Sequence, residues 1–261
     1  MQSFLLNEYG AYLCYHDLPG AEPARVFIHG LGSASSAEFV WTAAHPLLRD
    51  NRSILLDLPG FGYSDRPRRF GYSLEDHALC AARLLDHLQL KRCDLIGHSM
   101  GGSVAITLAA LRPDLVGRLV VAEGNLDPGG GSVSTPIAQQ PGWLFALAGH
   151  RLMLRRLKKG AFEGSAGVVS YHATVRACAS RSLHRSAVGL VRGTRPTMRE
   201  RFLNLDIPRA FIFGQRSLPD PDLAFLEQRG VRVFVVPDAG HAMMDDNPEG
   251  FARAVAEALE G

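Results

Sequence analysis

Short apolar runs alternate with amphipathic stretches along most of this chain. Runs of four to six residues rich in Val, Ile, Leu and Phe, bounded by glycine, proline or charged residues, are typical of buried strands. Such runs predict strands at 25–28, 52–57, 93–97, 119–122, 210–213 and 231–236. Two further runs, 4–6 and 11–15, flank the turn-like Asn7–Gly10 and predict a hairpin at the start of the chain.

Capping signals mark the helices between these strands. Ser73 and Asp76 have the spacing of a capping box, and apolar residues at helical spacing follow them. A second helix is predicted over 99–112, where a proline follows the last residue. The Asp-Pro pair at 220–221 and the Asn-Pro pair at 247–248 are start signals for the last two helices.

The order of these elements predicts the fold class. Strands that alternate with helices indicate an α/β fold, in which a mostly parallel sheet has helices on both faces. The alternation stops after Gly124, where a glycine run and a Ser/Thr/Pro stretch lead into 143–159, which is helical and then basic. We therefore predict a core of residues 1–123 and 206–261, with an inserted helical cap over 124–205.

Charge is distributed unevenly along the chain. The 261 residues carry 28 basic and 26 acidic side chains, a formal net charge of +2. Residues 151–201 hold twelve Arg or Lys and two acids, Glu163 and Glu200, so this segment carries +10 and the rest carries −8. Three interpretations stay open: a solvated basic exterior, a cap that attracts anionic substrates or an acidic carrier, and docking of 143–159 on a membrane surface.

Composition narrows the class of protein. Four scattered cysteines without a CxxC pair suit a reducing compartment, and the near-neutral net charge argues against a nucleic-acid binder. The first ten residues lack the basic region of a secretory signal, and no apolar run reaches the roughly 18 residues of a membrane span. We expect a soluble cytoplasmic protein. No metal is predicted, because no group of Asp or His residues has the spacing of metal ligands. No dinucleotide cofactor is predicted, because no G-x-G-x-x-G motif follows the first predicted strand.

A G-x-S-x-G motif at 97–101 supplies the candidate nucleophile, Ser99. The serine falls between a predicted strand and a predicted helix, where this motif forms a sharp turn. Small residues at Gly97 and Gly101 let the two backbones approach, and the start of a helix favours developing negative charge. An ordinary helix N-cap is the alternative role of Ser99.

The stretch His29-Gly30-Leu31-Gly32 follows an earlier predicted strand. Its glycines would let backbone amides turn toward a cleft. We predict an oxyanion hole made by the amides of Leu31 and Met100, where one donor typically contributes about 10² to 10³ in rate. A glycine-rich turn that only connects two elements is the alternative.

His241 is the candidate general base. It lies directly after the predicted strand 231–236 and before the final helix. A serine hydroxyl is a poor nucleophile until a neutral imidazole takes its proton. The chain order serine, acid, histidine is the one expected for this kind of sheet. We interpret His29 and His98 as residues that shape the pocket or make structural hydrogen bonds.

Four motifs together resemble the α/β-hydrolase family, of the small kind with an inserted cap. They are HGLG at 29–32, DLPGFGYSD at 57–65, GHSMGG at 97–102 and GHAMMDDNP at 240–248. The resemblance covers nearly the whole chain apart from the cap. It is specific for the fold and much less specific for the substrate.

The acid departs from the commonest pattern of the family. The family usually carries it shortly after the strand that here reads AFIFG, but this chain has Gly214-Gln-Arg-Ser217 there. Asp220 comes next and fits a helix cap, a role that already uses its oxygens. Glu123 is preferred, because it ends the strand LVVAE, where some dehalogenases and lactone hydrolases of the family carry their acid. Asp220 is kept as the alternative acid, and Asp127 also stays open.

These residues predict a serine hydrolase that forms an acyl-enzyme on Ser99 with His241 as the base. A small carboxylic ester is the default substrate, with a lactone or thioester as close variants, and the basic cap favours an anionic one. A serine in the nucleophile position disfavours haloalkane dehalogenase and epoxide hydrolase chemistry. Two alternatives stay open: cleavage of a carbon–carbon bond next to a ketone, and a ligand receptor that hydrolyses slowly or not at all.

Overall fold

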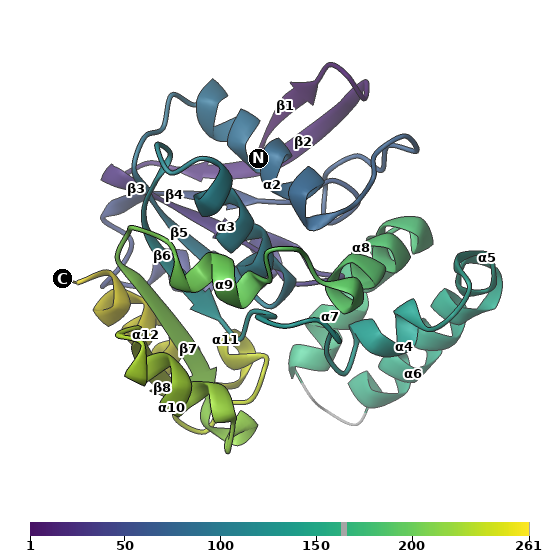
Figure 1. Cartoon of the computed structure of the whole chain (residues 1–261). Helices are drawn as coiled ribbons and strands as arrows, with labels where there is room; N and C mark the ends of the chain where they lie inside the picture. The colour runs from purple at the N-terminus through teal and green to yellow at the C-terminus, as the bar shows by residue number, and fades with distance from the viewer. Residues whose placement is uncertain (163–165, 261) are drawn as a thin grey trace.

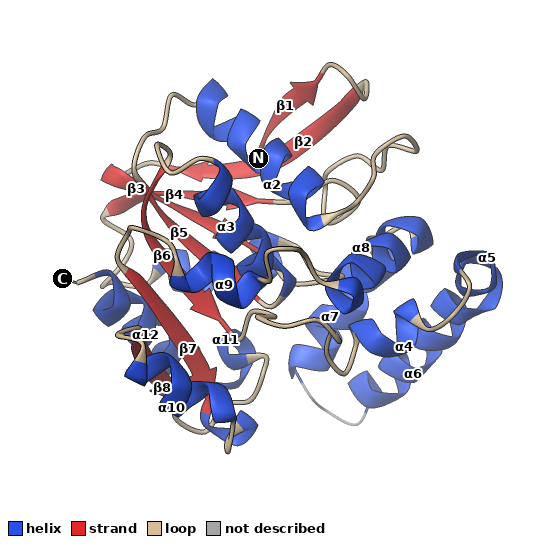
Figure 2. Ribbon diagram, in the orientation of Figure 1, coloured by secondary structure: helices blue, strands red, loops and turns tan. Residues whose placement is uncertain are grey.

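The structure is a computed structural model that describes residues 1–162 and 166–260. Glu163, one of the two acids counted within 151–201, lies outside the described residues. The described residues form one eight-stranded sheet in the order β1-β2-β4-β3-β5-β6-β7-β8, with helices on both faces (Figures 1 and 2). The strands are β1 (Gln2–Leu6), β2 (Ala11–Leu18), β3 (Ala21–Ile28), β4 (Asn51–Leu56), β5 (Cys93–His98), β6 (Val116–Ala122), β7 (Arg209–Gly214) and β8 (Arg232–Val236).

The sheet is mostly parallel, which confirms the predicted fold class. The six strands from β4 to β8 in the sheet order pair in parallel, and β1 and β2 add an antiparallel hairpin at one edge. The register places Val26 of β3 beside Ile54 of β4 and Leu95 of β5. Because successive side chains of a strand point to opposite faces, this register gathers apolar side chains into two layers.

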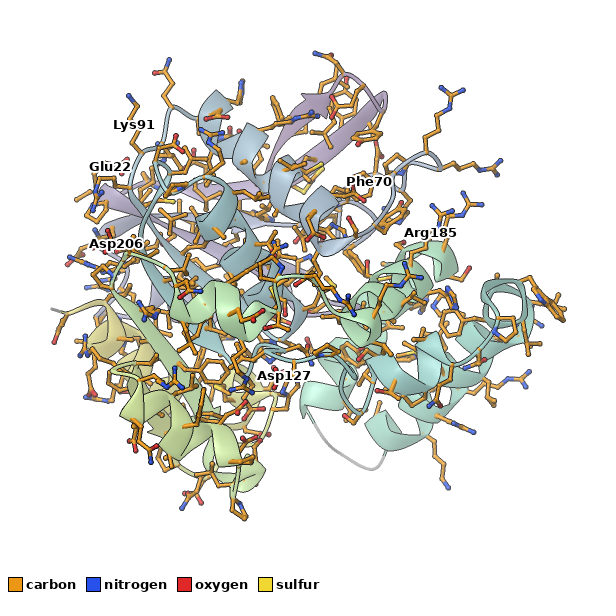
Figure 3. The ribbon with its side chains drawn as sticks, in the orientation of Figure 1. Glu22, Phe70, Lys91, Asp127, Arg185 and Asp206 are labelled. Carbon is orange, nitrogen blue, oxygen red and sulfur yellow. The ribbon has the colours of Figure 1, made fainter. Side chains whose placement is uncertain are left out.

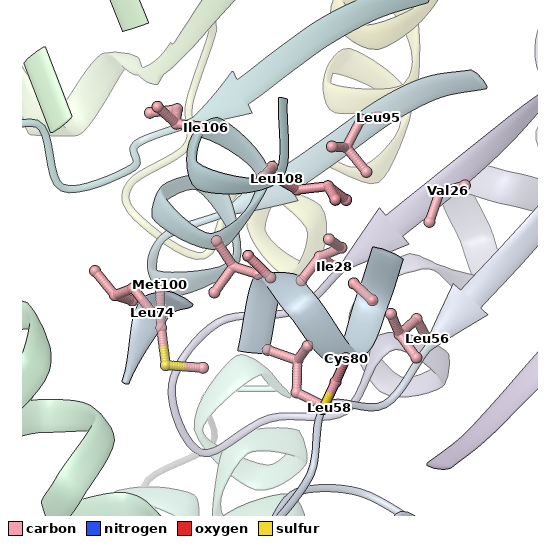
Figure 4. Packing of buried hydrophobic residues seen from close by; sticks show 14 of the residues in the cluster. Val26, Ile28, Leu56, Leu58, Leu74, Cys80, Leu95, Met100, Ile106 and Leu108 are labelled. Carbon is pink, nitrogen blue, oxygen red and sulfur yellow. The ribbon is translucent and has the colours of Figure 1, made fainter. Parts of the chain in front are cut away.

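The two layers form the core. Val26 and Ile28 of β3 belong to the layer that packs against α2 (Leu74–His87) and α3 (Met100–Leu111), as Figure 4 shows. Phe27, between them, belongs to the opposite layer. All three side chains are fully buried, and each contributes roughly 1.5–3 kcal/mol to folding through the apolar surface it removes from water.

Helices cover both layers. On the α2/α3 side, α9 (Met198–Leu203) and α10 (Pro221–Gln228) complete the cover. On the other side lie α1 (Ser35–Ala44), α11 (Met243–Asp246) and α12 (Pro248–Leu259). The predicted capping box is present at the start of α2, where the Asp76 amide donates to Ser73 Oγ at 3.1 Å.

Two helices differ from the sequence expectations. Helix α1 was not predicted, because its N-cap residue, Ala34, has no side chain that can bind the free amides of the first turn. The stretch 143–159 is not one regular helix: a π-helical turn over Phe145–Gly149 separates the short α5 (Gly142–Leu144) from α6 (His150–Phe162).

Several helices lie between β6 and β7. They are α4 (Ser134–Ala138), α5, α6, α7 (Ala166–Ala177), α8 (Ser180–Arg192) and α9, and Figure 1 shows α4 to α8 grouped beyond one end of the sheet. The Arg185 guanidinium of α8 donates to the Phe70 carbonyl at 3.0 Å, which joins this group to the loop before α2 (Figure 3). Within residues 1–162 and 166–260, each helix is too short or too polar to cross a bilayer.

Candidate active site

The carboxyl ends of the central parallel strands meet at one edge of the sheet. There β3 leads into His29–Gly32, β5 into Ser99, β6 into Glu123, and β8 into the loop that carries His241. In open α/β sheets this edge is where ligands bind. The topology therefore brings four distant stretches of the sequence to one place.

Ser99 sits on a strained turn between β5 and α3. Its backbone has φ +53° and ψ −120°, a combination that non-glycine residues rarely adopt. A side chain at Gly97 would place its Cβ 2.4 Å from the Gly101 carbonyl oxygen, and one at Gly101 would place its Cβ 2.1 Å from that of Ile28. Glycine is therefore required at both positions of the motif, since strand and helix backbones touch there.

The side chains of Ser99, His241 and Glu123 form a continuous chain of hydrogen bonds. His241 Nε2 lies 3.1 Å from Ser99 Oγ, and His241 Nδ1 lies 2.7 Å from Glu123 Oε2. The His241 side chain is 54% exposed, whereas that of Glu123 is 11% exposed. The imidazole is thus open to a ligand on one side and held by a mostly buried carboxylate on the other.

Glu123 is held in place by the neighbouring strand. Its amide donates to the Ile212 carbonyl at 3.0 Å, and its Oε1 accepts from the Gly214 amide at 2.8 Å. Burial opposes the charge of the carboxylate, but hydrogen bonds from His241, Gly214 and Ser217 outweigh it and hold the pKa of Glu123 below its ordinary value. An ionised carboxylate can accept the Nδ1 proton of His241 and stabilise an imidazolium.

The other candidate acids have different partners. Asp220 caps α10 by accepting from the Asp222 amide at 2.8 Å. Asp127, labelled in Figure 3, forms an ion pair with Arg199, which also binds Asp222 at 2.8 Å. Within the part of the chain that the structure describes, neither Asp220 nor Asp127 contacts His241.

The predicted oxyanion loop lies against the nucleophile. A Cβ added to Gly30 would be 3.3 Å from Ser99 Cβ. Leu31 follows Gly30 in this loop, and Met100 follows Ser99 as the first residue of α3. Among residues 1–162 and 166–260, no protein group accepts a hydrogen bond from the amide of either residue.

Hydrogen bonds fix this loop from two sides. His29 donates from Nδ1 to the Gly30 carbonyl at 2.8 Å and accepts the Leu58 amide at Nε2 at 3.0 Å, so its ring is neutral. The hydroxyl of Tyr171 in α7 donates to the Leu31 carbonyl at 3.0 Å. Sequence reasoning missed Tyr171, because nothing in its local pattern distinguishes it from other helix residues.

A second histidine–glutamate pair lies beside Ser99. His98 Nδ1 is 3.3 Å from Glu38 Oε2, and His98 Nε2 is 2.9 Å from the backbone carbonyl oxygen of His241. The side chains are 7% and 11% exposed, respectively. Sequence reasoning missed Glu38, which belongs to the unidentified helix α1. Its acidic side chain among the apolar residues of that helix was the available signal.

The sequence and fold of this chain have counterparts among known proteins. A family model described as "Alpha/beta hydrolase family" matches residues 26–254. The chain therefore belongs to the α/β-hydrolase family.

Curated relatives match part of this chain. The chain is 36% identical over 125 residues to a 2-hydroxymuconate semialdehyde hydrolase from Pseudomonas sp. (strain CF600), a match that covers 48% of this chain and 42% of that protein. The chain spans less than half the length of the first curated relatives it matches.

Two solved structures share the fold along the whole chain. A thermophilic esterase from Thermogutta terrifontis is 21% identical, with a TM-score of 0.82 and coverage of 99% of this chain and 98% of that one. The enol-lactonase from Burkholderia xenovorans LB400 is 20% identical, with a TM-score of 0.81 and full coverage of both chains.

Proposed function

We propose that this α/β hydrolase is a serine hydrolase that cleaves a carboxylic ester, a lactone or a thioester through an acyl-enzyme on Ser99. The observation that carries the proposal is the pair of hydrogen bonds from Ser99 to His241, 3.1 Å, and from His241 to Glu123, 2.7 Å. It supports this chemistry because a serine hydroxyl needs an adjacent base, and the base needs a partner on its second nitrogen.

The reaction proceeds in two halves. As Ser99 Oγ attacks the substrate carbonyl carbon, His241 Nε2 takes its proton, and Glu123 stabilises the imidazolium that forms. The same proton then goes to the leaving group, which departs and leaves the acyl group on Ser99. In the second half a water molecule gives its proton to His241 and attacks the acyl carbon, and Ser99 regains a proton as the acid leaves.

Negative charge on the carbonyl oxygen is stabilised by the amides of Leu31 and Met100. Their freedom from other acceptors among the described residues, and the closeness of Gly30 to Ser99, support this assignment. Each donor contributes about 10² to 10³ in rate, because it is already oriented before charge develops.

Residues 124–205 act as a cap over a core of residues 1–123 and 206–261. Contacts between α7 or α8 and the loops around the site support this division: Tyr171 binds the Leu31 carbonyl, and Ser182 Oγ donates to the Gly60 carbonyl at 3.1 Å. A preference for small anionic substrates stays a prediction, and docking of 143–159 on a membrane surface stays an alternative interpretation of its basic charge. The four free cysteines support a cytoplasmic location.

A second candidate reaction is hydrolysis of a carbon–carbon bond next to a ketone. It is favoured by the similarity to the 2-hydroxymuconate semialdehyde hydrolase, whose named substrate is a semialdehyde and not an ester. Turnover of a panel of substrates by the purified protein separates the two reactions. The panel contains p-nitrophenyl esters, acyl thioesters and lactones, together with ketones whose neighbouring carbon–carbon bond can be hydrolysed. Turnover of the ketones alone would overturn the ester proposal.

The nucleophile is tested by Ser99→Ala, with the exposed Ser132→Ala as control. We expect Ser99→Ala to lose turnover of the best substrate by about 10⁴-fold or more and to lose labelling by a fluorophosphonate probe. Ser132→Ala should keep both. Rapid labelling of the wild type without turnover of any substrate in the panel would instead indicate a receptor on this fold.

A further inference from the structure

His98 lies between two hydrogen-bond acceptors next to the candidate nucleophile. One is the Glu38 carboxylate, 3.3 Å from Nδ1, and the other is the His241 carbonyl, 2.9 Å from Nε2. A neutral imidazole has one N–H and can donate to only one of them, whereas an imidazolium donates to both. His29, which has one donor and one acceptor as partners, shows the neutral arrangement in the same site.

Glu38 is surrounded by groups that favour its ionised form. Both of its oxygens lie near the Gly30 amide, at 3.2 and 3.1 Å, and His98 lies on the same carboxylate. Burial opposes charge on both partners, but their mutual attraction and hydrogen bond outweigh it. The pKa of Glu38 is therefore below its ordinary value, and that of His98 is above its own.

The pair joins the three parts of the site. Glu38, from α1, holds the Gly30 amide of the loop that carries Leu31. His98, at the end of β5, holds the carbonyl of His241, and its ring lies 4.7 Å from the His241 ring. One buried contact thus links the oxyanion loop, the nucleophile turn and the base loop.

We propose that Glu38 and His98 are positioning residues of this active site, a buried carboxylate–imidazolium pair that sets the loops of Gly30 and His241 on either side of Ser99. This inference rests on the proposed serine hydrolase. The pair touches no reacting atom. Its effect arises because a displacement of about 1 Å of a catalytic group can reduce rate by as much as 10²-fold.

Several other ionisable groups lie around the pair. The ionisable groups that face the pair are His29 and Tyr171 toward Glu38, Glu123 and His241 toward His98, and Asp245 toward both. Burial, followed by repulsion from Glu38, raises the pKa of Asp245.

Kinetics of Glu38→Gln and His98→Asn test the positioning role. Glu38→Gln preserves shape and an acceptor for the Gly30 amide while it removes the charge. We expect kcat to fall by about 10- to 100-fold for either variant, with KM changed less than about twofold. The double variant should lose no more than the worse single variant, because the two residues act as one unit.

A matched control is available on the same helix. His45, which caps the C-terminus of α1, binds the exposed Glu249 at 2.9 Å and lies outside the site. Glu249→Gln removes this other histidine–glutamate pair and should leave kcat and KM unchanged. Equal losses in Glu249→Gln and Glu38→Gln would overturn a specific role of the buried pair.

The pH profile separates this role from a merely structural one. Without its counter-ion, buried His98 holds its proton less tightly, because Glu38 is what raises the pKa of His98 against the effect of burial. The ¹⁵N titration of the His98 ring should therefore move to lower pH in Glu38→Gln and stay in place in Glu249→Gln. An unmoved titration in a folded Glu38→Gln protein would overturn the proposal.

A direct observation avoids variants that fail to fold. Imidazole ¹⁵N spectra of the wild type, with His98→Asn to assign the signal, should show two protonated ring nitrogens for His98 at neutral pH. A single protonated nitrogen would overturn the proposal. This readout needs no turnover, so it stands apart from the proposed function, whose failure would appear as an active Ser99→Ala variant.

Discussion

The sheet edge and the proposed cap region (residues 124–205) use polar side chains in different ways. At the sheet edge, side chains bind other side chains, as in the chain from Ser99 through His241 to Glu123. Helices α7 and α8 of the cap region bind mainly backbone carbonyls of the core, as Tyr171 and Arg185 do. A contact to a carbonyl survives substitution of the residue that carries it. Each such contact of the cap region therefore depends on one side chain, the donor in the cap region, whereas each contact between Ser99, His241 and Glu123 depends on two.

The largest effect should come from the carboxylate that binds His241. We expect Glu123→Gln to lower kcat by about 10² to 10⁴-fold, because the amide no longer stabilises the imidazolium or fixes the ring. Asp220→Asn removes the alternative acid, which follows β7 and caps α10, and kcat should change less than about threefold. Steady-state kinetics on one ester decide between them, and the reverse order would contradict the assignment of Glu123.

Substitution of one glycine in a helix of each region tests how tightly the sheet edge and the cap region are packed. Gly101→Ala at the sheet edge forces a Cβ to 2.1 Å from the Ile28 carbonyl oxygen and should destabilise the fold by about 1–3 kcal/mol or prevent folding. Gly189→Ala in α8 meets no neighbour within 4 Å and should stabilise it by about 0.5–1 kcal/mol. Urea denaturation measures both, and a destabilised Gly189→Ala would remove the contrast.

Buried charge at the sheet edge should make stability depend on pH. The lowered pKa of Glu38 adds stability above the ordinary value of 4.5, which is lost as pH falls through the lowered pKa. The raised pKa of His98 adds stability below the ordinary value of 6.5, which is lost as pH rises through the raised pKa. The Tm difference between wild type and Glu38→Gln should thus be largest between pH 4.5 and 6.5 and shrink in alkali. A difference constant with pH would contradict this account.

The smallest effect should come from the cap region's contact with the oxyanion loop. Tyr171→Phe removes one hydrogen bond to the Leu31 carbonyl and should lower kcat/KM by about three- to tenfold, the loss expected for a neutral hydrogen bond. Tyr12→Phe, at an exposed position of the β1–β2 hairpin, is the control and should have no effect. A loss in Tyr171→Phe as large as in Glu123→Gln would show that the cap region takes part in the chemistry.

Local pattern was sufficient for most of the fold. The apolar runs predicted every strand of the sheet to within a few residues, because buried parallel strands are almost wholly apolar and end at charged or small residues. The Ser73 capping box and the Asp-Pro pair at 220–221 correctly predicted where two helices begin, because their hydrogen bonds join residues close together in the sequence. Helix α1 was missed because its start has no such bond.

By itself the sequence determined the parallel sheet and its strained serine turn, since both depend on residues close together in the chain. Only the tertiary structure decided which carboxylates meet which histidines. The parallel pairing of β6 with β7 sets Glu123 beside Gly214 and His241, and the packing of α1 against the sheet brings Glu38 to His98. Those contacts join residues 60 to 118 positions apart, and no local pattern encodes such a distance.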